Sequence, residues 1–461
     1  MKEMSLNQIA RACKGTYIGE ESKKYLEISG AVIDSRKVEP GYLFIAIKGE
    51  RVDGHSFIPS VFAKGAACVL CEHVPEHPAG PCILADSCLE ALKSLAEYYR
   101  STLSIPIVGI TGSVGKTSTK EMIAAVLGQK YNVLKTEGNF NNEIGLPLTI
   151  FRIREEHEAA VLEMGISDFG EMTRLSRMAK PNLCVITNIG LCHLENLKDR
   201  DGILKAKTEM FQEAQPGAQV ILNGDDDKLI TLRESRTPTP CFFGLDPSND
   251  LYAEQIENLG LDGTHCTFVT KAGSFTAHIP IPGRHMVYNA LAGTAVGLAL
   301  NLTPEQIKAG IEGLTPVSGR NNLIHTEKWT ILDDCYNANP VSMCASLDVL
   351  SFALGRKVAI LGDMGELGEH EKLLHYNVGC HAADAGIDAV FLVGELSRET
   401  ARGIEAKNPS LTFRHFGSKE ELLAALPLLL SKGDSILVKA SHFMEFGEIV
   451  DYLKNASGFT L

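Results

Sequence analysis

Short apolar runs alternate with amphipathic stretches along most of this chain. Between residues 28 and 84 the runs AVI, YLFIAI, ACVLC and CIL are separated by Gly, Pro and Asp, with one helical stretch at 58–64. This pattern predicts a small α/β domain. An amphipathic helix is expected over 87–99, and a Pro-bounded strand over 105–110. A second domain is predicted to begin here.

In the middle and at the end of the chain, strand-like runs alternate with helical stretches, which predicts two further helix-covered sheets. Strand-like runs at 161–166, 184–190 and 219–226 alternate with helical stretches, followed by a polar, hairpin-like insert around 252–281 and a helix over 285–300. After residues 314–320, the runs TILDD, KVAILGD, AVFLVG and SILVKA predict a second doubly wound sheet. We therefore expect an α/β protein with domains at 1–85, 86–315 and 316–461, in keeping with a length of 461 residues.

Composition narrows the choice of partners. The formal charge of -13 and the pI near 5.6 argue against nucleic acid, whose binders cluster Lys and Arg. The N-terminus lacks the apolar stretch of a signal peptide, and no later run is long enough to span a membrane, so a cytoplasmic protein is expected. The 12 cysteines are scattered, which favours reduced, mostly buried thiols; the pair Cys68 and Cys71 lacks the second pair that a zinc site needs.

The strongest chemical signal is the segment GITGSVGKTSTKEMIAAVL at 109–127, where an apolar strand runs through a Gly-rich turn into an amphipathic helix. Glycines let backbone N–H groups converge on phosphate oxygens, and the helix N-terminus adds positive charge. Lys116 is placed to reach the β and γ phosphates, and Thr117 to bind magnesium. A Gly-rich turn without function is the alternative. The first glycine of the usual P-loop pattern is Ile110 here, so this is a variant loop.

Further candidates lie where the predicted strands of the central sheet end. Glu163 closes an apolar run and His193 follows another, which places both at the carboxyl edge where open α/β sheets bind ligands. An oxygen and an imidazole near phosphates are possible magnesium ligands, whereas a capped strand end and a loop histidine are the plainer interpretation. Lys207, on a helical stretch, reads from its own surroundings as a solvated lysine.

Two polar segments leave ligand binding and turn formation equally open. EGNFNNEIGLP at 137–147 carries amide side chains and glycines that suit a polar ligand as well as a turn. DDCYNANP at 333–340 directly follows a strand, and its carboxylates with Tyr336 and Asn337 would suit a ribose and a base.

Taken together, these motifs resemble the Mur ligase family. The resemblance runs from about Asp34 to Lys439 and rests on eight segments in the family's order: DSRKVEPGYLFIAIKGERVDGHSFI, TGSVGKTSTKE, GNFNNEIGLPLT, LEMGISDFGEM, AKPNLCVITNIGLCHLE, PGRHMVYNALAG, DDCYNANP and LGDMGELG. It implies an N-terminal domain for a UDP-linked substrate, a central P-loop ATPase domain and a C-terminal Rossmann-like domain.

The activity implied is that of an ATP-dependent ligase. In such ligases a substrate carboxylate attacks the γ-phosphate, and an amine then displaces phosphate from the acyl phosphate; two magnesium ions neutralise the charge on the transferred group. GNFNNEIG, DDCYNANP and LGDMGELG are similar to the member that joins D-alanyl-D-alanine to UDP-N-acetylmuramoyl-tripeptide. We expect ATP, UDP-N-acetylmuramoyl-tripeptide and D-alanyl-D-alanine as small-molecule substrates, and we expect the protein to be a monomer.

The resemblance also assigns roles by position. Thr117 and Glu163 would hold the first magnesium, and His193 with a carbamylated Lys207 the second. Lys116, His193, Lys207 and Arg320 are the implied catalytic residues. Nucleotide contacts are implied for Gly112, Ser113, Val114, Gly115, Lys116, Thr117, Ser118, Asn289, Arg320, Asp334 and Asn337. Contacts with the UDP substrate are implied for Ser35, Arg36, Asp53, Gly54, His55, Asn139 and Asn142.

The sequence departs from the family pattern at two more places. Val114 stands where Asn is usual in the P-loop, and Lys439-Ala440-Ser441-His442-Phe443 stands where the family has Gly-Ser-Arg. The second change bears on which dipeptide is used. A folylpolyglutamate-synthase-like ligase is one alternative, although it is expected to lack the N-terminal DSR and DGH segments. A nucleotide-dependent switch is the other, and it leaves two α/β domains without a purpose.

Overall fold

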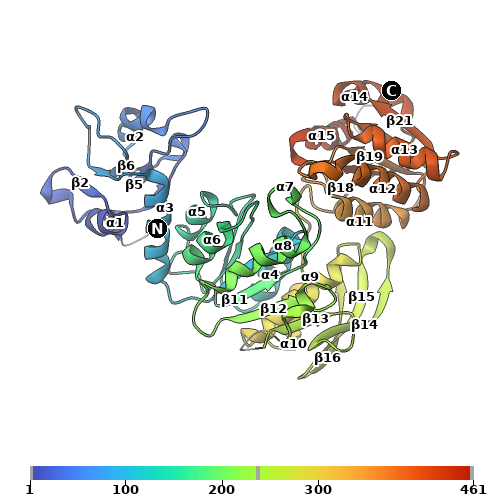
Figure 1. Cartoon of the computed structure of the whole chain (residues 1–461), viewed down its shortest axis with the longest axis horizontal. Coiled ribbons are helices and arrows are strands. Elements are labelled where there is room, and N and C mark those ends of the chain that lie inside the picture. Colours follow the sequence, from blue (N-terminus) through green and yellow to red (C-terminus); the bar gives the residue numbers. More distant parts are fainter. Residues whose placement is uncertain (1–3, 235–238, 457–461) are drawn as a thin grey trace. The chain divides into compact units, whose positions relative to one another are not determined.

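The computed structural model describes residues 4–234 and 239–456. In this part of the chain the strands form sheets of two, five, nine and six strands, with helices packed around the three larger sheets (Figure 1). By packing, the described residues divide into two compact units, one drawn from 4–111, 130–185 and 206–220 and the other from 112–129, 186–205, 221–234 and 239–456. The α/β class is confirmed, whereas the domain limits at 85/86 and 315/316 stay predictions.

The five-stranded sheet uses the four apolar runs predicted between 28 and 84. Its order is β2 (Thr16–Ile18), β7 (Cys82–Leu84), β6 (Cys68–Cys71), β5 (Tyr42–Ile45) and β4 (Gly30–Val32), and only β2 is antiparallel to its neighbour. Helix α2 (Ile58–Ala63) buries Ile58 and Val61 against Phe44 and Val69. Beside this sheet, β1 (Met4–Ser5) pairs with β3 (Glu27–Ile28). Helix α3 (Cys88–Ser101) packs against α1 (Leu6–Ala12), α5 (Gly145–Ile150) and α6 (Glu171–Ala179).

The nine-stranded sheet combines parallel strands with the predicted hairpin-like insert. Its order is β16 (Gly273–Ile279), β15 (Thr264–Thr270), β14 (Leu251–Asn258), β13 (Cys241–Gly244), β12 (Gln219–Asn223), β11 (Leu183–Ile186), β8 (Ile107–Thr111), β10 (Ala159–Glu163) and β9 (Val133–Lys135). Strand β10 lies parallel to β8 and β9, whereas β15 lies antiparallel to both β14 and β16. The antiparallel strands confirm the insert expected at 252–281. Strand β11 was predicted to end at residue 190, but it ends at Ile186.

Helices α4 (Lys116–Leu127), α9 (His285–Ala299) and α10 (Pro304–Glu312) pack against one another. Gly310 allows α10 to approach α4 closely, because a Cβ atom on Gly310 would lie 2.4 Å from the Cα atom of Val126. Two shorter helices, α7 (Leu194–Leu197) and α8 (Arg200–Thr208), follow β11. The P-loop helix α4 is thus held on two sides by helices that follow the insert.

The six-stranded sheet has helices on both faces, as the doubly wound pattern predicted. Its order is β17 (Asn322–His325), β18 (Thr330–Asp333), β22 (Ser435–Lys439), β19 (Lys357–Gly362), β20 (Ala389–Val393) and β21 (Thr412–Phe416), and only β17 is antiparallel. Side chains of α11 (Pro340–Ser351), α12 (Glu371–Asp384) and α13 (Ser397–Lys407) form one core. Side chains of α14 (Lys419–Leu429) and α15 (Gly447–Ala456) form the core on the other face (Figure 1).

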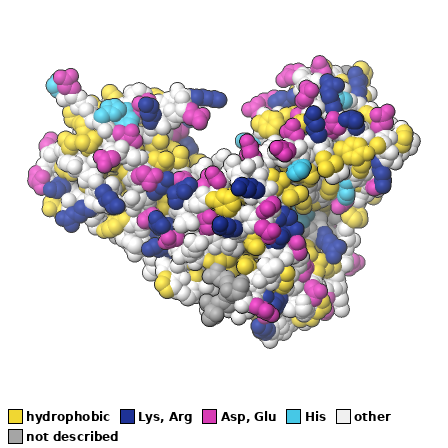
Figure 2. Space-filling view, in the orientation of Figure 1, with side chains coloured by type: hydrophobic (Ala, Val, Ile, Leu, Met, Phe, Trp, Pro, Cys, Tyr) yellow, Lys and Arg dark blue, Asp and Glu magenta, His cyan; other side chains and the backbone are white. Residues whose placement is uncertain are grey.

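The structure shows how the charged side chains and the cysteines are distributed. On the face drawn in Figure 2, Lys and Arg side chains are interspersed with Asp and Glu, rather than gathered into the broad basic area typical of nucleic-acid binders. Among the helices of the described residues, none is both long and apolar enough to cross a membrane. All 12 cysteines lie in the described part, and they are free thiols.

Candidate active site

The loop between β8 and α4 has the backbone conformation of a phosphate cradle. Gly112 has a φ of 153° and Gly115 a φ of 81°, and Gly115 directly precedes the first residue of α4. A Cβ atom on Gly112 would lie 1.9 Å from the Oγ1 atom of Thr187, so no side chain fits there. The backbone itself therefore requires these two glycines.

Two residues that follow β11 hold this loop in place. The Val114 amide donates to Asn188 Oδ1 at 3.0 Å, and Thr187 Oγ1 donates to the Val114 carbonyl at 2.7 Å. The Ser113 amide donates to the Asn188 carbonyl at 3.1 Å. Because position 114 is held through its backbone, valine can replace the usual asparagine without loosening the loop. Ile110, the other departure, is a fully buried residue of β8.

Lys116 and Thr117 begin helix α4 next to this loop. The Nζ atom of Lys116 donates to the Gly112 carbonyl at 2.9 Å, so the ammonium group lies over the loop. Thr117 is buried, and the N-terminus of α4 directs its positive end toward the same place. The loop, the cation and the helix dipole together suit a polyphosphate.

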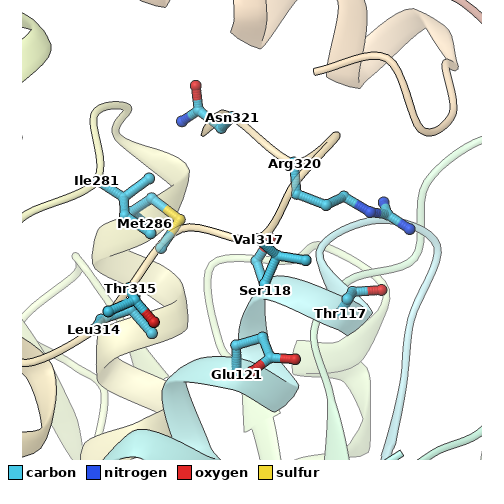
Figure 3. Close-up of a pocket in the computed structure, with 10 residues that line it drawn as sticks. All are labelled: Thr117, Ser118, Glu121, Ile281, Met286, Leu314, Thr315, Val317, Arg320 and Asn321. Carbon is cyan, nitrogen blue, oxygen red and sulfur yellow. The ribbon is translucent and has the colours of Figure 1, made fainter. Parts of the chain in front are cut away.

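A small pocket lies beside the first turns of α4 (Figure 3). Apolar side chains line one part of it, and Figure 3 shows Arg320 extending over Thr117 at the start of the helix. The lining residues are Thr117, Ser118, Glu121, Ile281, Met286, Leu314, Thr315, Val317, Arg320 and Asn321. An apolar wall next to a phosphate loop suits the flat base of a nucleotide. This wall was not predicted, because no motif in the sequence distinguishes its apolar residues from core residues.

Asn289 of α9 lies next to the phosphate loop and is buried. Its Oδ1 atom accepts a hydrogen bond of 2.9 Å from Thr119 Oγ1 in α4, and a Cβ atom on Gly115 would lie 3.6 Å from the same oxygen. The predicted adenine-contacting residue is therefore brought to the P-loop helix. Met286, one turn earlier, lines the pocket.

Glu163 occupies the carboxyl end of β10, as predicted. It pairs in register with Ile110 near the end of β8, and it is only 2% exposed. The Asn141 Nδ2 atom donates to Glu163 Oε1 at 2.9 Å, and the Glu163 amide donates to Thr136 Oγ1 at 3.0 Å. A buried, oriented carboxylate at the edge of the sheet from which the phosphate loop leaves fits a magnesium ligand.

Lys207 of α8 was interpreted from its surroundings in the sequence as a solvated lysine, and that interpretation is wrong. It is 1% exposed, so it is not a solvated helix lysine. Burying an ammonium group is unfavourable unless its charge is compensated or removed. The burial is thus compatible with the carbamate that the family resemblance implies.

His193 follows β11 in a left-handed conformation, with a φ of 50°, and immediately precedes α7. Its Nδ1 atom lies 2.9 Å from Glu366 Oε2. Within residues 4–234 and 239–456, no three His, Cys, Asp or Glu side chains are grouped to hold a metal. The predicted magnesium ligands are of another kind, because they include a threonine hydroxyl and a modified lysine.

The segment 333–340 uses its polar groups largely within the fold. Asp334 accepts hydrogen bonds from Lys439 Nζ at 2.5 Å, Ser346 Oγ at 2.6 Å and the Asn321 amide at 3.0 Å. Asn337 Oδ1 accepts from the Ala338 amide at 2.9 Å. Tyr336 stacks under the Arg320 guanidinium at 4.0 Å. Asp334 therefore orients the residue that follows Arg320, whereas the Asn337 side chain accepts a hydrogen bond within its own segment.

Among the residues predicted to bind the UDP substrate, some are exposed and others are buried in the fold. The side chain of Arg36 is 87% exposed beside Ser35, and its hydrogen bonds to Asp34 lower the pKa of that carboxyl to about 2. His55 is instead buried: its Nδ1 lies 2.7 Å from Asp53 Oδ1, and its Nε2 accepts from the Glu72 amide at 2.9 Å. Gly54 is packed equally tightly, since a Cβ atom there would lie 2.7 Å from the Ile47 carbonyl oxygen.

The Asn-rich segment 137–147 divides its amides between two tasks. Asn142 Oδ1 accepts from the Gly145 amide at 2.8 Å and so forms a turn, whereas Asn139 is exposed. Asn141, which was not singled out in the sequence, is the residue that holds Glu163. Only the pairing of distant segments distinguishes Asn141 from its neighbours.

Comparisons with known proteins bear on the whole chain. Three family models match it: the Mur ligase middle domain at 110–297, the Mur ligase glutamate ligase domain at 319–442, and the Mur ligase family catalytic domain at 27–98. A curated UDP-N-acetylmuramoyl-tripeptide--D-alanyl-D-alanine ligase from Bacillus subtilis (strain 168) is 40% identical over 455 residues, which cover 98% of each chain.

Solved structures are similar over almost the full length. A crystal structure of MurF from Acinetobacter baumannii has a TM-score of 0.89 at 30% identity and covers 99% of both chains. A crystal structure of the MurF ligase from Thermotoga maritima in complex with ADP has a TM-score of 0.81 at 30% identity, and covers 93% of this chain and 97% of the other.

Proposed function

This chain belongs to the Mur ligase family, and we propose that it joins D-alanyl-D-alanine to UDP-N-acetylmuramoyl-tripeptide with the consumption of ATP. The observation that carries the proposal is the 40% identity, over 98% of both chains, to a relative named for this reaction. The product would be the UDP-linked pentapeptide used in peptidoglycan synthesis. The match at 27–98, which spans the DSR and DGH segments, favours this ligase over a folylpolyglutamate-synthase-like one.

We propose that the phosphate loop binds ATP with its backbone amides and with Lys116. The left-handed glycines and the start of α4 support this role, and so does the ADP in the similar ligase from Thermotoga maritima. Ser118 and the apolar residues of the pocket would hold the rest of the nucleotide, with Asn289 nearby. Arg320 would reach the phosphates from above Thr117 (Figure 3).

We further propose that Thr117 and Glu163 hold one magnesium ion, and that His193 and a carbamylated Lys207 hold a second. When bound, the ions would neutralise negative charge on the transferred phosphoryl group. The burial of Glu163 and its orientation by Asn141 support the first assignment. The burial of Lys207 supports the second, because a carbamate is an anionic oxygen ligand.

The proposed reaction has two steps. The terminal carboxylate of the tripeptide attacks the γ-phosphorus of ATP, which releases ADP and leaves an acyl phosphate. The amine of D-alanyl-D-alanine then attacks the acyl carbon, and phosphate leaves as the amide bond forms. The residues around the phosphate loop must keep water from the acyl phosphate, since hydrolysis would waste ATP. We expect this chemistry in the cytoplasm, where ATP is available, and we expect a monomer.

The reaction is tested by following phosphate release from ATP. We expect release only when the UDP-linked tripeptide and D-alanyl-D-alanine are both present. A panel of tripeptides and dipeptides would then define specificity, including any effect of His442. Equal ATP hydrolysis without the two peptide substrates would refute the ligase assignment.

The carbamate is tested at Lys207. We expect Lys207→Ala to lose activity, bicarbonate to leave the variant inactive, and a short carboxylic acid to restore part of the rate, because it can replace the missing carboxylate. Lys205→Ala, an exposed lysine on the same helix, is the matched control and should stay active. Full activity of Lys207→Ala would rule the carbamate out.

A further inference from the structure

His193 and Glu366 meet in an arrangement that neither local sequence predicts. His193 Nδ1 lies 2.9 Å from Glu366 Oε2. Both residues have left-handed backbones, with φ values of 50° and 61°, which non-glycine residues adopt only against an energetic cost. Strain at both ends of one hydrogen bond indicates that the surrounding fold maintains the contact, and such strain concentrates at functional sites.

A second contact supports the pairing of the two loops. Helix α7 begins directly after His193, and the 3-10 helix at Gly368–His370 begins two residues after Glu366. These two elements pack together, and a Cβ atom on Gly368 would lie 3.9 Å from the Glu195 backbone nitrogen. The position of Glu366 near His193 therefore depends on backbone packing as well as on its own side chain.

The contact does little for the stability of the fold. The side chain of Glu366 is 70% exposed and that of His193 is 24% exposed. Water screens such pairs strongly, and exposed ion pairs contribute little to folding. The segment LGDMGELG, which contains Glu366, resembles the family motif, but none of its residues has been assigned a role. Its glutamate needs another explanation.

We propose that Glu366 is a positioning residue, which fixes the tautomer and the ring orientation of His193 so that Nε2 is presented to magnesium. The inference rests on the proposed role of His193 as a metal ligand. A histidine ligand usually donates its second ring N–H to a carboxylate or a carbonyl, and this bond sets which nitrogen meets the metal. A carboxylate at Nδ1 keeps the proton there and leaves the lone pair on Nε2.

The pair also joins two sheets. His193 follows β11 of the nine-stranded sheet, and Glu366 follows β19 of the six-stranded sheet. Separation of the two loops would break the hydrogen bond and release the imidazole to rotate. In this way Glu366 makes the orientation of a metal ligand depend on the C-terminal sheet.

The experiment measures binding of a non-hydrolysable ATP analogue to the full-length protein over a range of Mg²⁺ concentrations. We expect Glu366→Ala to raise the Mg²⁺ concentration needed for half-maximal binding about tenfold, the lower end of what loss of such a partner causes. Glu366→Gln keeps an acceptor oxygen and should fall in between. Glu369→Ala, which removes an exposed carboxylate from the same turn, should match the wild type, and all melting temperatures should agree.

A double-mutant cycle with His193→Ala decides whether Glu366 acts through His193. We expect Glu366→Ala to have no further effect in that background. An equal effect in both backgrounds, or no effect in either, would overturn the inference. If His193→Ala alone leaves the Mg²⁺ requirement unchanged, the metal role of His193 fails and the inference fails with it. A normal effect of His193→Ala beside a silent Glu366→Ala overturns the inference alone.

Discussion

Gly112 shows how one backbone conformation can decide whether the phosphate loop forms. Its φ of 153° places the missing side chain toward Thr187, whose hydroxyl in turn holds the Val114 carbonyl. A side chain at position 112 would therefore displace one of the groups that anchor the loop. Gly217 also has a positive φ, of 80°, but has open space around it.

We expect Gly112→Ala to weaken binding of the ATP analogue about 100-fold, which corresponds to about 3 kcal/mol of displacement and strain. Gly217→Ala should leave affinity unchanged, since only a local strain of about 1 kcal/mol arises there. Titration calorimetry measures both. Wild-type affinity in Gly112→Ala would show that the loop can shift without cost.

At the scale of elements, an ion cluster fixes the Asn-rich segment between two helices. Glu143 contacts Lys93 of α3 at 2.5 Å and also Arg174 of α6. Burial alone would raise the pKa of Glu143, but hydrogen bonds from Lys93 and Arg174 outweigh it and leave the pKa below its ordinary value of 4.5. Helices α3 and α6 thus hold the segment whose Asn141 orients Glu163.

This cluster predicts a pH dependence. A carboxyl with a depressed pKa stabilises the folded form above its ordinary value of 4.5, and that contribution is lost as pH falls through the lower, folded-state pKa. At neutral pH, Glu143→Gln should therefore speed hydrogen exchange of backbone amides within 138–147. Below the folded-state pKa, the wild type and the variant should converge once exchange is corrected for its intrinsic pH dependence. A constant difference at every pH would exclude the charge as the cause.

At the scale of the whole molecule, the proposed nucleotide site draws on segments far apart in the chain. Helix α4 supplies Thr117 and Ser118, and the segment leading to the six-stranded sheet supplies Val317 and Arg320 (Figure 3). Arg320 also stacks on Tyr336, which lies beyond β18. A nucleotide in this pocket would therefore contact both helix α4 and the segment that leads to the six-stranded sheet.

We expect the ATP analogue with Mg²⁺ to change the small-angle scattering profile of the protein toward a smaller radius of gyration. Arg320→Ala should reduce that change, because it removes the side chain that extends over the start of helix α4 from the segment leading to the six-stranded sheet. Lys328→Ala, a cation on the same stretch of chain outside the pocket lining, serves as the control. Identical profiles with and without ligand would contradict the expectation.

Local patterns were informative wherever neighbouring residues share one environment. The buried runs that became β5, β6, β18, β19, β20 and β22 are continuous apolar stretches, and they were predicted. Strands β17 and β21 were missed, because both are edge strands with partly exposed side chains and weak patterns. Strand β11 ends earlier than its apolar run suggested, since Thr187 and Asn188 turn to the phosphate loop.

The sequence by itself determined the α/β class, the phosphate loop and the family, because each depends on residue types at fixed spacing along the chain. Only the tertiary structure decided that Lys207 and His55 are buried, that Asn141 orients Glu163, and that Glu366 meets His193. These facts depend on which distant segments pack together. Burial and hydrogen bonding are properties of a side chain's neighbours in space, and the order of residues along a chain does not specify them locally.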